Sequence, residues 1–258
     1  MVSPLRRKKS SELLTQVIIR DIFDSKAKPL LLELSGSNTK EYVILKQGDD
    51  VRNDWFIQTI CNLFNTLWQK EINGSLQPYI YTYKSTPLSF NMGCIQCVSN
   101  VEPARSFAWE KINELPKEKK DKLLVSIAGS SIASYVLGIR DRHQDNMLIK
   151  DGHIYFHIDF GHLWNQGPVV DAPRIAFPRR FRKVISQEEW DQLVLICTEA
   201  YMILRNHSKE IIHIATSLFR TIDENTCTIE AFLSGPDSLM LGVDDTLARE
   251  KFERSFRK

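Results

Sequence analysis

Residues 13–98 combine several short β-rich runs with one stretch of helical periodicity. The short runs are apolar and rich in β-branched and aromatic residues, and polar turn residues separate them, which is typical of strands. They predict strands at 13–22, 29–34, 42–46, 78–83 and 93–98. Residues 54–71 carry apolar side chains at every third or fourth position and predict a helix. This part of the chain is therefore expected to be rich in strands.

The pattern changes after residue 98. An apolar run at 123–137 and a strong helical period at 188–219 predict helices. Residues 146–150 and 153–158 predict a hairpin around an Asp-Gly turn. The chain is thus expected to be an α+β protein with a strand-rich N-lobe at 13–98 and a mostly helical C-lobe at 99–258. Residues 1–12 are polar and basic and are expected to be frayed.

Composition narrows the class of protein. With 43% hydrophobic and 26% charged residues, the 258-residue chain has the make-up of a globular protein with a sizeable core. A formal net charge of +2 is too small to indicate a nucleic-acid-binding protein. Nucleic acid is therefore not expected among its partners.

Cysteine usage and hydropathy indicate the compartment. The cysteines are odd in number and lie in apolar runs, which favours a reduced, cytoplasmic protein over a disulfide scaffold; they are Cys61, Cys94, Cys97, Cys197 and Cys227. The Cys-x-x-Cys at 94–97 has no second pair and no nearby His, and is interpreted as part of a strand rather than as a zinc site. No apolar run is long enough to span a bilayer, and no signal peptide is recognised. Membrane contact is therefore expected to be peripheral.

Candidate chemistry lies at two short motifs. Residues 141–146 are Asp-Arg-His-Gln-Asp-Asn, and residues 159–161 are Asp-Phe-Gly. In phosphoryl-transfer enzymes, a carboxylate and an amide hold Mg²⁺ close to a catalytic base. Asp141, Asn146 and Asp159 have the same relative positions as those groups in protein kinases. The first triplet is inverted, however, because protein kinases have His-Arg-Asp.

These motifs resemble the phosphoinositide 3-/4-kinase family. The resemblance covers 138–146 and 157–162, and extends to 46–54, which is similar to the family's Lys-x-Gly-Asp-Asp-x-Arg-x-Asp segment. Residues 237–242 and 248–252 resemble the end of a 3-kinase catalytic domain. The resemblance implies a two-lobed protein-kinase-like fold, with the catalytic loop at 138–146 and the activation segment at 159–186.

The resemblance also implies an ATP site. Lys46 would contact the α-phosphate, Asp54 would orient Lys46, and the loop containing Ser25 and Lys26 would cover the phosphates. The hinge, the inner pocket and the residues packed on the adenine ring would be supplied by Gln96, Cys97, Val98, Tyr79, Leu148 and Ile158.

The implied reaction transfers the ATP γ-phosphate to an inositol hydroxyl. Asp141 and His143 would position and deprotonate that hydroxyl, and Asn146 and Asp159 would hold Mg²⁺, with Mn²⁺ as an alternative. Lys46 would neutralise charge that develops on the phosphates. Which of Asp141 and His143 is the base stays open, because their pKa values depend on burial and neighbours.

Specificity is expected in the segment after Asp-Phe-Gly. Residues 165–171 contain no lysine, whereas 3-kinases that use the bisphosphorylated lipid have a lysine-rich box there. This favours phosphatidylinositol or a monophosphate as substrate. Cationic residues follow later in the segment and are candidates for contact with the headgroup at a membrane surface. A run of charges is, however, also typical of a solvated face. The residues are Arg174, Arg179, Arg180, Arg182 and Lys183.

The leading hypothesis is a cytoplasmic, peripherally membrane-associated lipid kinase that acts at the 3-hydroxyl. The alternatives are a phosphatidylinositol 4-kinase, a protein serine/threonine kinase of the related family, and a binding module that lacks catalysis. A regulatory or recruiting protein is an expected partner, since the sequence shows none of the family's usual accessory domains. The chain is interpreted either as a catalytic fragment or as an unusually small enzyme.

Overall fold

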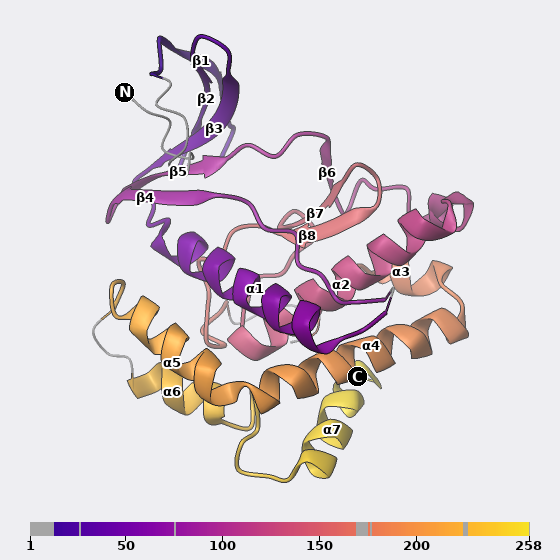
Figure 1. Cartoon of the computed structure of the whole chain (residues 1–258). Coiled ribbons are helices and arrows are strands. Elements are labelled where there is room, and N and C mark those ends of the chain that lie inside the picture. The colour runs from indigo at the N-terminus through magenta and orange to yellow at the C-terminus, as the bar shows by residue number, and fades with distance from the viewer. Residues whose placement is uncertain are drawn as a thin grey trace. The chain divides into compact units, whose positions relative to one another are not determined.

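The computed structural model describes residues 13–25, 27–74, 76–168, 175, 177–223 and 227–257 (Figure 1). The chain divides into two compact units, which are described separately: unit 1 comprises described residues from 1–59 and 83–99, and unit 2 comprises those from 60–82 and 100–258. Residues 1–12, Lys26 and Arg174 lie outside the described residues, as does the side chain of Arg179.

Unit 1 contains a five-stranded antiparallel sheet in the order β1-β2-β3-β5-β4 (Figure 1). Four of its strands confirm predicted ones within a few residues: β1 (Gln16–Ile22), β2 (Leu30–Ser35), β3 (Lys40–Gln47) and β5 (Met92–Gln96). The edge strand β4 (Ser85–Ser89) was not predicted. One face of the sheet buries Leu32, Leu34, Val43 and Cys94. This core holds β3, and hence Lys46, in place.

Helix α1 (Arg52–Glu71) confirms the helix predicted at 54–71. Asp50 precedes it, and the Asp50 carboxylate accepts a hydrogen bond from Arg52 N at 3.0 Å. Val51, the residue before α1, packs against β5 at Gly93. A Cβ at position 93 would lie 1.9 Å from Val51 Cγ2, so the contact requires glycine there. The division between the units falls within α1.

The strand predicted at 78–83 is wrong. These residues belong to no strand, although several of their backbone N–H groups donate hydrogen bonds. Tyr79 N donates to Val125 O at 3.1 Å, and Ile80 N donates to the Asn65 side chain at 2.8 Å. These N–H groups donate to Val125 and Asn65, which lie in helices, rather than to a neighbouring strand. The described residues from 60–82 belong to unit 2.

Unit 2 is built around α2 (Lys117–Leu137), whose residues from Leu123 onward are all buried. The helix contacts α4 (Gln187–Asn206) and strand β8 (Ile154–His157). The predicted hairpin is confirmed, since β8 pairs antiparallel with β7 (Met147–Lys150). The turn residues Asp151 and Gly152 have φ values of 51° and 71°, as a type I′ turn requires. A third strand, β6 (Val101–Pro103), completes this sheet.

The long helix predicted at 188–219 is interrupted at His207, which separates α4 from α5 (Ser208–Phe219). Helix α4 begins with a capping box in which Ser186 and Glu189 exchange hydrogen bonds. Strand β6 and the remaining short elements were not predicted; the latter are η1 (Trp109–Glu114), α3 (Arg179–Val184), α6 (Cys227–Ser234), α7 (Asp245–Arg254) and η2 (Ser255–Arg257). The α+β class is confirmed. Within the described ranges, every helix is too short or too polar to cross a bilayer.

Candidate active site

The catalytic loop begins where α2 ends. Gly138 terminates the helix in the left-handed conformation at a φ of 57°. The chain after Asp-Phe-Gly passes very close to it, because a Cβ on Gly138 would lie 2.6 Å from Asn165 N. Asn165 N donates to Gly138 O at 2.8 Å, and Trp164 N donates to Leu137 O at 3.1 Å. The start of the catalytic loop and the start of the activation segment are therefore bonded together.

Both motif aspartates adopt an unusual backbone conformation. Asp141 and Asp159 each have a φ of 60°. Asp is among the few residue types other than glycine that adopt the left-handed region at modest cost. Asn146 donates from its side-chain amide to Asp141 O at 3.0 Å, and Ile158 N donates to Asn146 O at 3.1 Å. These bonds join the two motifs through Asn146.

The donor set of Asn146 and Asp159 fits Mg²⁺. Because Asn146 Nδ2 donates to a carbonyl, its Oδ1 is the atom that remains to face a ligand. An amide oxygen and a carboxylate are hard oxygen donors, and Mg²⁺ is often held by one or two protein groups together with water and phosphate oxygens. No cluster of three or more His, Cys, Asp or Glu that could hold a metal occurs in the part of the chain that the structure describes.

His143 lies between two carboxylates near the protein surface. Its Nε2 is 4.0 Å from Asp141 Oδ2, and its Nδ1 is 4.0 Å from Asp145 Oδ2. Asp145 N donates to His143 Nδ1 at 3.2 Å. Arg105 holds Asp145 through an ion pair of 2.8 Å. Nε2 is thus the ring nitrogen on the side of Asp141.

His157, two residues before Asp159, is a structural residue. Ser134 Oγ and Tyr155 Oη lie 3.0 and 2.8 Å from its two ring nitrogens. Burial, together with the nearby Arg142 guanidinium, holds the pKa of His157 well below its usual value, so the ring is neutral. A neutral, doubly bonded histidine fixes the end of β8, and thereby the segment that leads to Asp159.

In unit 1, the side chains of Lys46 and Asp54 each form a polar contact with a nearby residue. Lys46 Nζ pairs with Asp49 Oδ2 at 2.8 Å, an interaction that the sequence did not predict. Asp54 lies buried in the first turn of α1 and accepts a hydrogen bond from the Tyr83 hydroxyl at 3.2 Å. Ser25 lies in the turn between β1 and β2, where its N donates to Phe23 O at 3.0 Å.

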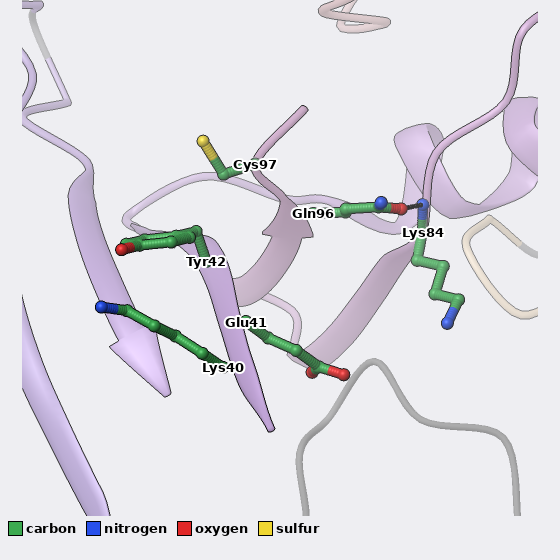
Figure 2. A pocket seen from close by; sticks show the side chains of 6 residues that line it. All are labelled: Lys40, Glu41, Tyr42, Lys84, Gln96 and Cys97. Carbon is green, nitrogen blue, oxygen red and sulfur yellow. Dashed lines mark hydrogen bonds between the residues drawn. The ribbon is translucent and has the colours of Figure 1, made fainter. Parts of the chain in front are cut away.

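The predicted hinge residues line a polar depression of unit 1. Gln96 and Cys97 border it together with Lys40, Glu41, Tyr42 and Lys84. Figure 2 shows the Gln96 side chain pointing to the Lys84 backbone, whose N donates to Gln96 Oε1 at 3.1 Å. Gln96 N donates to Lys84 O at 2.8 Å, and Cys97 N donates to Tyr42 O at 3.0 Å. Both N–H groups thus donate to neighbouring backbone carbonyls, and the hinge role of Gln96, Cys97 and Val98 stays a prediction.

The other predicted adenine-pocket residues belong to unit 2. Tyr79 is partly exposed, and burial of the remainder raises the pKa of its hydroxyl. Leu148 is paired on β7 with Phe156, and Ile158 directly precedes Asp159. Both are half-buried.

Two of the predicted headgroup cations are engaged within the protein. Arg180 Nη2 contacts both carboxylate oxygens of Glu110, at 2.7 and 2.8 Å, and this arginine lowers the pKa of Glu110. The Arg182 guanidinium lies over the Trp190 ring at 4.6 Å. Lys183 is exposed. The headgroup role of these residues stays a prediction.

Comparisons with known proteins agree with the motifs. The family model "Phosphatidylinositol 3- and 4-kinase" matches residues 42–123 and 117–220. The chain belongs to this family. The match includes Lys46, Asp54 and the catalytic loop, together with Asp159. The identification made from the two motifs in the sequence is thus confirmed.

Relatives within the family are named as 3-kinases. The chain is 29% identical to phosphatidylinositol 3-kinase 1 of Dictyostelium discoideum, with 89% of the chain and 16% of the relative aligned. It is 30% identical to phosphatidylinositol 3-kinase VPS34 of Candida glabrata, with 75% of the chain and 24% of the relative aligned. The corresponding values for phosphatidylinositol 3-kinase catalytic subunit type 3 of Caenorhabditis elegans are 28%, 68% and 22%. The chain therefore spans less than a quarter of the length of these relatives.

Proposed function

We propose that the protein transfers the γ-phosphate of ATP to the 3-hydroxyl of an inositol lipid. The proposal rests on two hydrogen bonds of Asn146 that connect the motifs. Its side-chain amide donates to Asp141 O, and its backbone carbonyl accepts from Ile158 N, directly before Asp159. This arrangement gathers a base candidate and two hard oxygen donors, which is the set that phosphoryl transfer needs. The 3-kinase names of the relatives favour the 3-hydroxyl.

In this proposal, units 1 and 2 are the two lobes of a kinase-like fold. Unit 1 supplies Lys46, which contacts the phosphates, and Asp54, which supports it from α1. Unit 2 supplies Asp141, Asn146 and Asp159.

Asp141 is the preferred base. His143 Nδ1 already accepts a hydrogen bond from Asp145 N, and the Asp141 carboxylate lies on the Nε2 side of the ring. The Asp141 carboxylate accepts the proton of the inositol hydroxyl, and His143 orients that hydroxyl or a phosphate oxygen. Asn146 and Asp159 would hold Mg²⁺, which would supply positive charge to neutralise the ATP phosphates. Lys46 contributes a further positive charge to the phosphates.

The substrate is phosphatidylinositol or a phosphatidylinositol monophosphate. Residues 165–171 have no lysine to bind additional headgroup phosphates. Arg180 and Lys183 are the candidates for the phosphates that the lipid does carry. Access to the lipid makes the protein a cytoplasmic, peripherally bound enzyme, recruited by a partner protein or by its own basic loops.

The test is a phosphotransfer assay with the purified chain, Mg²⁺, labelled ATP and vesicles that contain phosphatidylinositol or its mono- or bisphosphates. The positional isomer of each product is determined, and Asp159→Asn serves as the inactive variant. A 3-phosphorylated product that is lost in the variant supports the proposal. A 4-phosphorylated product would establish the 4-kinase alternative instead.

Two further outcomes would overturn the proposal. Transfer to a peptide but not to any lipid would indicate a protein kinase. Failure of the folded chain to bind Mg²⁺-ATP in a calorimetric titration would indicate a binding module without catalysis.

A further inference from the structure

A single arginine contacts the backbone of both motifs. Arg142 is 3% exposed, although it carries a full charge and follows Asp141 directly. Its Nε donates to Arg140 O at 3.0 Å and its Nη1 donates to Ile158 O at 2.7 Å. Its Nη2 donates to Asp159 O. One guanidinium therefore binds the carbonyl on the N-terminal side of Asp141 and the two carbonyls on either side of the Asp159 Cα atom.

From this geometry, and resting on the proposed function, we infer that Arg142 is a positioning residue that sets the Asp159 carboxylate for metal binding. Arg142 contacts neither metal nor substrate in this inference. It acts through the backbone, by holding the residue that would bind the metal in a left-handed conformation that this backbone would otherwise rarely adopt.

The left-handed geometry of Asp159 explains why such a contact is needed. At a φ of 60°, a residue with a side chain is in a sparsely populated conformation that persists only where surrounding contacts fix it. The Arg142 hydrogen bonds to the carbonyls of Ile158 and Asp159 fix the two peptide planes adjacent to the Asp159 Cα atom. The Arg142 guanidinium also lies 5.5 Å from the Phe160 ring centroid, which supports it from the following residue.

The planar fork of arginine is essential to this arrangement. Five N–H donors with fixed directions can reach several carbonyls at once, whereas the single ammonium group of lysine is a compact charge on a flexible stem. Arg142→Lys therefore keeps the charge near the site but loses the simultaneous contacts. A role based on charge alone predicts no change on this substitution.

The chain offers a matched control in Arg205. Arg205 is also buried, at 8% exposure, and donates to the carbonyls of Leu239, Met240 and Val243 in the C-terminal part of unit 2. Arg205→Lys thus removes the same kind of multiple carbonyl contact, together with the Nε contact to Asp245 at 2.9 Å, and likewise retains the charge. It leaves the contacts between the motifs intact. A general loss of stability should affect both variants, whereas a loss of positioning should affect only Arg142→Lys.

The primary measurement is amide hydrogen exchange of residues 157–162 in the full chain without metal or nucleotide. We expect Arg142→Lys to speed exchange there roughly tenfold, because the peptides that Arg142 holds become free to open. The second measurement is the affinity for Mn²⁺ by electron paramagnetic resonance, which should fall roughly tenfold if the Asp159 carboxylate is no longer preset. Arg205→Lys should leave both values at the wild-type level.

Kinetics supply a third readout where lipid phosphorylation is observed. Arg142→Lys should lower kcat and raise the Mg²⁺ concentration needed for half-maximal rate, with the KM for lipid unchanged. Unaltered exchange and Mn²⁺ affinity in Arg142→Lys would overturn the inference, as would equal changes in Arg205→Lys. Because the first two readouts need no reaction, they test the inference even if the proposed lipid kinase activity is absent.

If Arg142→Lys does not fold, Phe160→Leu replaces it in both measurements that need no reaction. This variant keeps Arg142 but removes the ring beside its guanidinium. Intermediate increases in exchange and in the Kd for Mn²⁺ are expected, and wild-type values would overturn the inference.

Discussion

Gly129 provides the sharpest test of how unit 2 places the segment that contains Tyr79. This glycine lies within α2, where the extended residues 78–83 cross the helix. A Cβ at position 129 would lie 2.4 Å from Tyr79 O and 2.6 Å from Tyr79 C. Both are backbone atoms, so no side chain can rotate away to relieve the overlap. Gly129→Ala must therefore move the crossing segment by about 1 Å, since ordinary Cβ contacts begin at about 3.4 Å.

Two effects of the substitution lower the free energy of unfolding, and a third raises it. Overpacking of this kind costs about 1–3 kcal/mol. The movement also strains the hydrogen bond from Tyr79 N to Val125 O, worth about 1 kcal/mol. Alanine is a better helix former than glycine, which returns about 1 kcal/mol. The free energy of unfolding should thus fall by about 1–3 kcal/mol, equivalent to a decrease in Tm of roughly 2–12 °C for a chain of this size.

Chemical denaturation with urea measures this loss, and Ser131→Ala is the control on the same helix. The buried Ser131 hydroxyl has no hydrogen-bond partner within the described structure, so its removal should be neutral or stabilising. Calorimetry should also show weaker ATP binding in Gly129→Ala if Tyr79 lines the adenine pocket. A Gly129→Ala protein that is as stable as wild type, or more so, would refute the close crossing.

Two further predictions concern charged groups. The hydrogen bond from Arg20, with smaller contributions from Lys40 and Tyr42, lowers the pKa of Glu33 to about 2. This pKa is below the value of about 4.3 in unfolded chains. The stability that the Glu33 carboxylate contributes is therefore present above pH 4.3 and is lost as pH falls towards 2. The Tm difference between wild type and Glu33→Gln should therefore shrink steadily when thermal melts are repeated from pH 5 down to pH 3, and a constant difference would contradict the assignment. Glu110→Gln should release Arg180 from its exposed ion pair and add one effective positive charge, strengthening binding to anionic vesicles by about fivefold at low salt. Co-sedimentation measures this change, and unaltered binding would argue against a headgroup role for Arg180.

Much of the fold could be predicted because the relevant signals are local. The Asp151-Gly152 turn specifies its hairpin through two residues that readily adopt positive φ, and α1 has a regular apolar period. The family was also recognisable from sequence, since the candidate catalytic and metal-binding residues Asp141, Asn146 and Asp159 lie in short motifs whose order is diagnostic.

The parts that could not be predicted depend on contacts between distant residues. Nothing in residues 78–83 indicates that their hydrogen-bond partners are Val125 and the Asn65 side chain rather than a strand. The break at His207 lacks the usual Gly or Pro signal, so periodicity continued through it. Strand β6 has only three residues and owes its existence to β7 beside it. The Arg142 contacts likewise connect positions 16 and 17 residues apart along the chain.

The backbone also explains why aspartate suits both motif positions beyond its charge. Asp141 and Asp159 both have a φ of 60°, where Asp and Asn pay less than most residues with a side chain. Replacement by alanine would remove the carboxylate and also disfavour the conformation that directs it. Replacement by asparagine removes the charge but keeps the conformational preference, so an Asp159→Asn variant isolates the role of the charge. One residue type thus meets two requirements, a carboxylate for the chemistry and tolerance of a left-handed backbone, and Arg142 links the two places in the chain where both are needed.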